Sequence, residues 1–136
     1  ASPGFEGDPS RNIPPHKYRP EDTQNFTALL AEFRRQLDDL SQQNGKHYLL
    51  TIAAPAGPEN YNRIELDKIH PYLDWINVMT YDMHGSWEPT GPTNFQAPLY
   101  SSPDDPTRPV VSVDKTITDY LAMGVPPEKL VMGVPF

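Results

Sequence analysis

The sequence has no cysteine, few basic residues and no long apolar run. The absence of cysteine among the 136 residues excludes a disulfide framework and any thiolate metal site. Lys and Arg number 11 against 18 Asp and Glu, which gives a formal net charge of -7. This balance argues against nucleic acid as the main partner, because phosphate binding needs a basic surface. No apolar run approaches the ~20 residues that cross a bilayer, so we expect no membrane partner.

Proline is abundant, but its distribution is uneven. Of the 17 prolines, five fall in residues 1–20 and six in residues 89–109, whereas none lies between Glu21 and Ala54. Proline fixes φ and lacks a backbone donor, so these two clusters predict loops. A low-complexity linker is the alternative for residues 1–20. The hydrophobic fraction of 37% predicts a folded core rather than a wholly disordered chain.

Helical and strand patterns alternate along the rest of the chain. Apolar residues at three- and four-residue steps predict an amphipathic helix that begins near Asp22 and ends at Gly45. A short helical segment is predicted over residues 59–73, and Ser112 and Gly124 bound a third helix. Each helix precedes a continuous apolar run, which predicts a strand buried on both faces; these runs are 48–54, 75–81 and 130–134. The order predicts an α/β fold with a parallel sheet.

The densest chemical segment follows the second predicted strand. Active sites of parallel α/β folds lie at the carboxyl ends of the strands. Met79 and Tyr81 point to the same side of that strand because they are two residues apart. Asp82 follows where strand gives way to loop, and Trp87 offers a flat apolar face that suits a sugar ring. These four residues are therefore the candidate site residues.

Each candidate also has a purely structural interpretation. Tyr81 alone is more often a packing residue whose hydroxyl is satisfied, and Asp82 alone suits a loop cap. A loop tryptophan such as Trp87 more often packs against the edge of a core than binds a ligand. Asp82 and His84 hint at a metal site, but the two-residue spacing has no third ligand nearby, so we expect no metal. No glycine-rich nucleotide-binding motif occurs, and no cofactor is expected.

Longer stretches of the sequence are more informative than these single residue types. Residues 66–88, with Met79-Thr80-Tyr81-Asp82 inside them, resemble glycoside hydrolase family 18, the chitinases. Residues 19–26 resemble the entry to that family's fourth helix, and residues 49–57 resemble its fifth strand. Residues 97–100 resemble the loop after its sixth strand, and residues 129–136 resemble its seventh strand. The resemblance implies a partial (β/α)8 TIM barrel, roughly strands five to seven with the helices before them. Residues 1–136 are then part of a single catalytic domain.

One family motif is absent. The family carries an Asp-x-x-Asp-x-Asp-x-Glu run on its fourth strand, and the last Glu is the general acid. No such run occurs here, and by the family's order it would precede Ala1. We therefore expect an internal fragment of the catalytic domain that is inactive by itself.

The resemblance also implies a reaction and a role for each candidate residue. The reaction is the retaining, substrate-assisted hydrolysis of β-1,4-linked N-acetylglucosamine polymers. Tyr81 would hydrogen-bond the acetamido oxygen that attacks the anomeric carbon, and Asp82 would contact the sugars beside the cleaved bond. Met79 would form the floor under the acetamido group, and Trp87 would stack on a sugar on the leaving-group side.

The implied parent protein is a secreted, monomeric chitinase of the endo-acting type. Its partner would be chitin or chitooligosaccharide. The alternative is a non-catalytic, lectin-like relative that keeps the barrel and binds chitin without cleaving it. The residue at the position of the general acid discriminates between the two.

Overall fold

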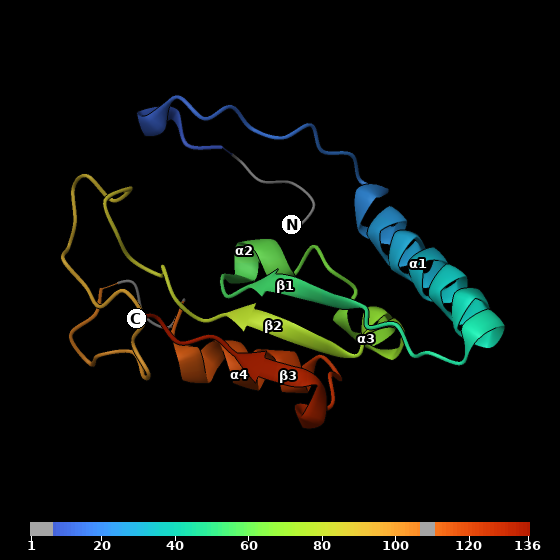
Figure 1. Cartoon of the computed structure of the whole chain (residues 1–136). Coiled ribbons are helices and arrows are strands. Elements are labelled where there is room, and N and C mark those ends of the chain that lie inside the picture. The colour runs from blue at the N-terminus through green and yellow to red at the C-terminus, as the bar shows by residue number, and fades with distance from the viewer. Residues whose placement is uncertain (1–6, 107–110) are drawn as a thin grey trace.

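A computed structural model of the chain describes residues 7–106 and 111–136. Its sheet has three parallel strands in the order β1-β2-β3, namely β1 (Thr51–Pro55), β2 (Trp75–Met79) and β3 (Leu130–Met132) (Figure 1). The predicted parallel α/β sheet is therefore confirmed. The strands are shorter than predicted, because residues 48–50 precede the register that pairs Thr51 with Trp75.

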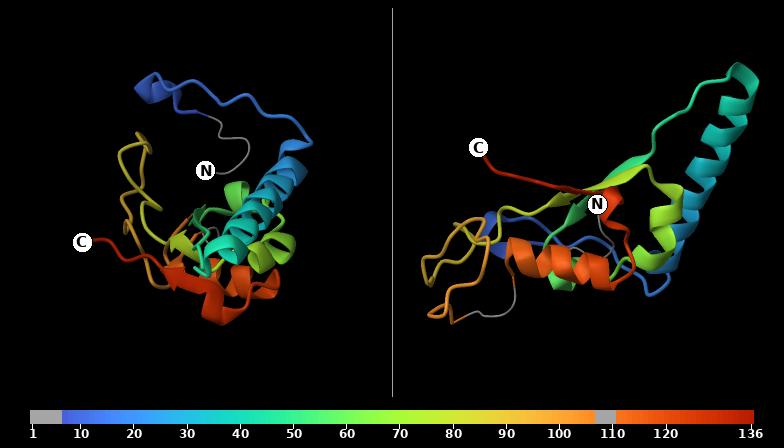
Figure 2. Two further views of the ribbon diagram at one scale, coloured as in Figure 1. Left: turned by 45° about the vertical axis from the view of Figure 1, so that its right-hand side comes forward. Right: turned by 90° about the horizontal axis from the view of Figure 1, so that it is seen from below.

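A helical segment precedes each strand in the sequence. The helices are α1 (Asp22–Asn44), α2 (Pro58–Tyr61), α3 (Leu66–Ile69) and α4 (Val113–Ala122), with 3-10 turns at Pro9–Arg11, His70–Tyr72 and Pro127–Lys129. Figure 2 shows α4 running along one side of the strands. Each β-strand thus leads back to the next through a helical connection, as in a barrel.

The sheet is buried on one face only, which corrects the prediction of burial on both. Ile76 and Val78 of β2 are 0% and 1% exposed, and Ala54 beside Val78 is 0% exposed. On the opposite face Ala53 is exposed and its partner Asn77 is only partly buried. The described helices pack against the first face alone. The apolar runs therefore reflect a second face that no element among the described residues covers.

The segment 59–73 is not one helix. It consists of α2, α3 and a 3-10 turn, separated by backbone turns at Asn62–Glu65. The predicted apolar positions nevertheless face the core, since Ile64, Leu66 and Ile69 are at most 6% exposed. Short pieces suffice here because these side chains pack with the rest of the core cluster, which includes Leu30, Tyr61, Leu73, Ile76, Val78, Tyr120 and Val125.

The helix α1 begins and ends as predicted, but its apolar stripe is only partly buried. Gly45 adopts the left-handed conformation at φ 69° and donates its N–H to the Ser41 carbonyl, which ends the helix. Leu30 is buried, whereas Leu29 and Phe33 stay about half exposed. Figure 2 shows α1 leaning away from the sheet. The helix contacts α3 and the following 3-10 turn, and part of its apolar surface has no neighbour among the described residues.

Both proline clusters lie outside the helices and strands wherever the structure describes them, apart from the 3-10 turn Pro9–Arg11. Residues 1–6 of the first cluster and 107–109 of the second lie outside the described residues. Among residues 7–106 and 111–136, no helix combines the length and the apolar character that crossing a membrane requires.

Candidate active site

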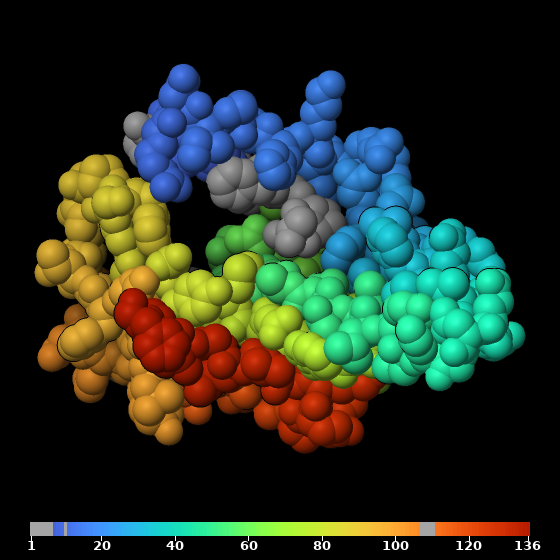
Figure 3. Space-filling view, in the orientation of Figure 1, coloured from blue at the N-terminus to red at the C-terminus, as the bar shows by residue number. Residues whose placement is uncertain are grey.

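A cavity of about 320 Å³ lies at the carboxyl ends of β1 and β2. The four predicted site residues, Met79, Tyr81, Asp82 and Trp87, all line it. The remaining lining residues are Pro55, Ala56, Gly57, Glu59, Asn60, Met83 and Val111. Figure 3 shows this end of the molecule hollowed between green α2, the yellow loop after β2 and the blue N-terminal segment. The structure thus brings the predicted residues together in one place.

Asp82 sits at an unusual backbone position. Its φ of 53° lies in the left-handed region, which non-glycine residues rarely adopt and which clusters at functional sites. Gln96, from the loop after β2, donates its side-chain amide to the Asp82 carboxylate at 2.5 Å. The Gln96 carbonyl also accepts the N–H of Met83 at 2.8 Å. One loop residue therefore holds both the backbone and the exposed carboxylate of this turn.

The Tyr81 ring packs against the end of β3. A Cβ on Gly133 would lie 2.7 Å from Cε1 of Tyr81 and 2.8 Å from the carbonyl oxygen of Val78, so only glycine fits there. The Thr80 hydroxyl donates to the Gly133 carbonyl at 2.7 Å and fixes the two strand ends together. Among the described residues, the hydroxyl of Tyr81 has no hydrogen-bond partner. Tyr81 therefore lines the cavity with a hydroxyl donor that the described residues leave unused.

Helix α4 anchors the opposite wall of the cavity. The Tyr120 hydroxyl donates to the Pro55 carbonyl at 2.7 Å, and the Thr116 hydroxyl donates to the Ala56 carbonyl at 3.0 Å. Tyr120 is fully buried, and burial raises the pKa of its hydroxyl. The hydroxyl therefore stays protonated and donates throughout the working pH range. These two bonds fix the strand end from which Glu59 and Asn60 follow.

A second buried tyrosine, Tyr61, packs against Tyr120 and supports the same wall. The hydroxyl of Tyr61 donates to the Asp119 carboxylate, which also receives Lys115 Nζ at 2.5 Å. Burial, and after it the hydrogen bond to Asp119 and the Asp119 charge, raise the pKa of Tyr61. Burial favours the neutral form of Asp119, but the hydrogen bonds from Lys115 and Tyr61 outweigh it and lower its pKa. The rings of Tyr61 and Tyr120 meet edge to face at 5.4 Å.

Three residues of the site are not among those predicted from the sequence. Glu59 and Asn60 line the cavity at the start of α2, and their position after the first strand was the available signal. Gln96 contacts Asp82 from 14 residues away, and nothing in the local pattern points to it. The Asp82 and His84 side chains make separate contacts, the latter with Glu88. No group of three metal-ligating side chains occurs in the described part of the chain.

The sequence profile of glycosyl hydrolases family 18 matches residues 7–136. The chain belongs to this family. Chitinase A1 of Niallia circulans is 43% identical over 122 residues, which is 87% of this chain and 17% of that protein. Endochitinase 1 of Metarhizium robertsii is 39% identical over 123 residues, which is 88% of this chain and 28% of that protein.

Solved structures of the family share the fold. Chitinase ChiA74 from Bacillus thuringiensis superposes with a TM-score of 0.85 at 50% identity and covers 91% of this chain, which in turn covers 20% of ChiA74. The chain therefore spans less than a third of each of these family 18 proteins. The predicted partial TIM barrel is confirmed, with β1, β2 and β3 as neighbouring strands. The open face of the sheet is the one that a closed barrel turns inward.

Proposed function

We propose that this chain forms part of the substrate cleft in a chitinase that hydrolyses β-1,4-linked N-acetylglucosamine polymers. The observation that carries the proposal is the convergence of Met79, Tyr81, Asp82 and Trp87 on one cavity at the carboxyl end of a family 18 sheet. In barrel enzymes this end of the strands holds the catalytic groups. The names of the similar chitinases support the same substrate class.

The reaction we propose is substrate-assisted. The acetamido oxygen of the sugar attacks its own anomeric carbon, the bond to the leaving sugar breaks, and the leaving oxygen takes a proton from a general acid. Water then attacks the same carbon and regenerates the acetamido group with retained configuration. Because the nucleophile belongs to the substrate, the protein's task is to orient the acetamido group and to stabilise its developing charge.

The cavity residues suit these tasks. The unpaired hydroxyl of Tyr81 is a donor for the acetamido oxygen, and the packing against Gly133 holds it in place. Asp82 presents a carboxylate that Gln96 orients, which suits the acetamido N–H or a sugar hydroxyl. Met79 provides an apolar floor, and the 37% exposed Trp87 offers its ring to a sugar on the leaving-group side.

The general acid is a separate part of the proposal. The carboxylates that line the cavity are Asp82 and Glu59, and the family's acidic run is absent from the sequence. We propose that the acid comes from a barrel strand outside these 136 residues, so that the chain alone does not cleave chitin. Endo action is supported by the named endochitinase relative. Secretion fits an insoluble polymeric substrate that cannot enter a cell, and we propose that the parent enzyme is a monomer.

The test needs a complete barrel, here meaning residues 7–136 joined to the remaining barrel segments of ChiA74. We expect this complete barrel to hydrolyse the N-acetylglucosamine tetramer and to release product that is initially the β-anomer, as observed by proton NMR. A folded barrel without activity, or an initial α-anomer, would contradict the proposal. The isolated 136-residue chain serves as the negative control.

The protein's own reading frame separates the enzyme from a lectin-like relative. A Glu at the end of the acidic run supports hydrolysis. Gln, Leu or Ile at that position, together with oligosaccharide binding and no turnover, would instead support the binding protein.

A further inference from the structure

Trp87 is carried by a tight turn. The Glu88 N–H donates to the Gly85 carbonyl at 3.1 Å, which closes the turn around Ser86 and Trp87. A Cβ on Gly85 would collide with the Trp87 ring, so the indole lies directly over this glycine. A bare backbone turn of this kind fixes only the path of the chain. Something further must hold it against the protein if the indole is to keep one orientation.

The Glu88 carboxylate provides that second restraint. One of its oxygens accepts the Gly85 N–H at 3.1 Å, and both lie 3.2 Å from Nδ1 of His84. A carboxylate can only accept, so Nδ1 carries the proton in this contact. The Glu88 carboxylate, at the end of the turn, therefore bridges His84 and Gly85 at its beginning.

His84 connects this bridge to the interior. The residue is 8% exposed, and its Nε2 atom is buried without a hydrogen-bond partner among the described residues. Glu88 is partly buried, with 28% of its side chain exposed. The buried imidazole is therefore the more constrained partner of the contact, and the Glu88 carboxylate links the turn to it. A hydrogen bond to an ionised group is about twice as strong as a neutral one.

We propose that His84 and Glu88 are positioning residues that hold the Trp87 indole toward the sugar on the leaving-group side. This inference rests on the proposed function, because it assigns the pair a role in binding the same substrate. Without the carboxylate, the turn keeps only its backbone bond, and the indole must be ordered each time a sugar binds. The expected consequence is weaker binding of long oligosaccharides with little change in the chemical step.

The experiment compares a long and a short substrate in the complete barrel. The long one is the N-acetylglucosamine hexamer, and the short one is β-chitobiosyl fluoride, whose leaving fluoride has no ring for Trp87 to contact. For Glu88→Ala we expect KM for the hexamer to rise about 10-fold, with the loss confined to that substrate. Glu88→Gln restores most of the binding, because its amide oxygen still accepts the Gly85 N–H. The exposed Glu128→Ala serves as the matched control.

A double-mutant cycle gives the decisive readout. In a Trp87→Ala background, Glu88→Ala should have no further effect on KM, since the residue to be positioned is gone. Equal losses on both substrates, or additive effects with Trp87→Ala, would show a merely structural role and overturn the inference. An unchanged KM in Glu88→Ala would overturn it as well. A folded parent barrel that cleaves neither substrate would instead overturn the proposed function.

Discussion

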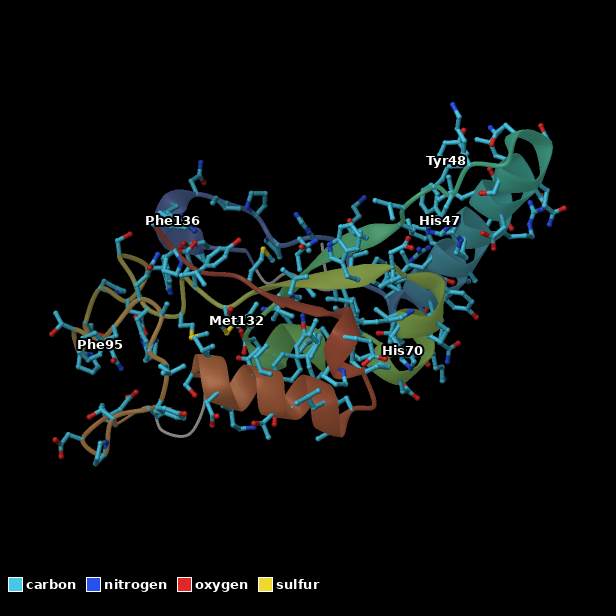
Figure 4. All side chains as sticks on the ribbon, turned by 60° about the horizontal axis from the view of Figure 1, so that its bottom comes forward. His47, Tyr48, His70, Phe95, Met132 and Phe136 are labelled. Carbon is cyan, nitrogen blue, oxygen red and sulfur yellow. The ribbon has the colours of Figure 1, made fainter. Side chains whose placement is uncertain are left out.

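Asp74 at the amino end of the sheet and Tyr81 at its carboxyl end differ in their hydrogen bonding. At the amino end, Asp74 accepts the Leu50 N–H at 2.6 Å, His47 Nε2 at 2.6 Å and Arg34 at 3.5 Å. At the carboxyl end, the hydroxyl of Tyr81 has no partner within the described residues. Figure 4 shows His47 at one end of the molecule and Phe95, in the loop after β2, at the other.

The amino end is built for stability. Lys129 Nζ donates to the carbonyls of His70 and Leu73 at 2.6 and 2.7 Å, and so ties the start of β3 to the segment before β2. Burial favours the neutral form of Asp74, but the Leu50 N–H, His47 and Arg34 outweigh it and lower its pKa. At this end the Asp74 carboxylate is engaged by three groups of the protein, whereas at the carboxyl end the Tyr81 hydroxyl has no partner among the described residues. The comparison predicts that mutations at the two ends separate stability from activity.

The largest effect is expected for Tyr81→Phe. Removing the hydroxyl takes away a donor to the developing charge, and a single such donor is worth about 100- to 1,000-fold in kcat. The ring packing against Gly133 is retained, so the free energy of unfolding should change by less than about 0.5 kcal/mol. Steady-state kinetics and urea unfolding of the complete barrel provide the two readouts. Wild-type turnover in this variant would remove Tyr81 from the mechanism.

At the amino end of the sheet, Asp74→Asn should lower stability and leave activity unchanged. We expect a loss of about 2–3 kcal/mol in the free energy of unfolding, because the ionised acceptor of Leu50 N–H, His47 and Arg34 is lost. The kcat of the folded fraction should stay the same. A large kcat loss with unchanged stability would break the comparison.

The stability difference between the parent and Asp74→Asn is expected to depend on pH in one direction. The pKa of Asp74 is lower in the folded state, so its stabilisation is full above its unfolded pKa near 3.9 and is lost as pH falls through the folded value. Urea unfolding at pH 6 and pH 3 should therefore show the gap between the parent and Asp74→Asn narrowing in acid. A constant gap would contradict the ionised state of Asp74.

Two glycines give a matched pair of smaller effects. In Gly133→Ala the new Cβ meets the Tyr81 ring and must displace it, so we expect kcat to fall about 10-fold. In Gly45→Ala the Cβ meets nothing within 4 Å, and the cost of the positive φ is about 1 kcal/mol in stability. Kinetics and unfolding of both variants check the pair. Unaltered kinetics for Gly133→Ala would show that the Tyr81 position tolerates movement.

The smallest effect is expected for Tyr120→Phe. The Pro55 carbonyl loses its hydroxyl donor, which should lower the free energy of unfolding by about 1 kcal/mol. Because Thr116 still holds the Ala56 carbonyl, we expect KM to change less than about 2-fold. Calorimetry and kinetics on the complete barrel decide this, and a large KM change would mean that the wall is held by Tyr120 alone.

The sequence predicted the order of elements well, because periodicity and the glycine and proline positions are local signals. Gly45 ends α1, and Ser112 caps α4 through a hydrogen bond from the Lys115 N–H. Strand burial was predicted wrongly, since an apolar run such as 48–54 reports the neighbours of a whole barrel rather than those within this chain.

The candidate site was predictable only in part. Met79, Tyr81, Asp82 and Trp87 are close in sequence, so the strand end and the family resemblance sufficed to group them. The contact of Gln96 with Asp82 depends on how a loop folds back over 14 residues, and no residue pattern encodes that path.

The most direct test of the account is a crystal structure of the complete barrel with a bound N-acetylglucosamine oligosaccharide. We expect an acetamido oxygen about 2.7 Å from the Tyr81 hydroxyl, a sugar hydroxyl or acetamido N–H hydrogen-bonded to Asp82, and the Trp87 indole against a sugar face. An oligosaccharide that lies elsewhere, or that leaves the hydroxyl of Tyr81 without a contact, would contradict the assignment of this cavity as the substrate site.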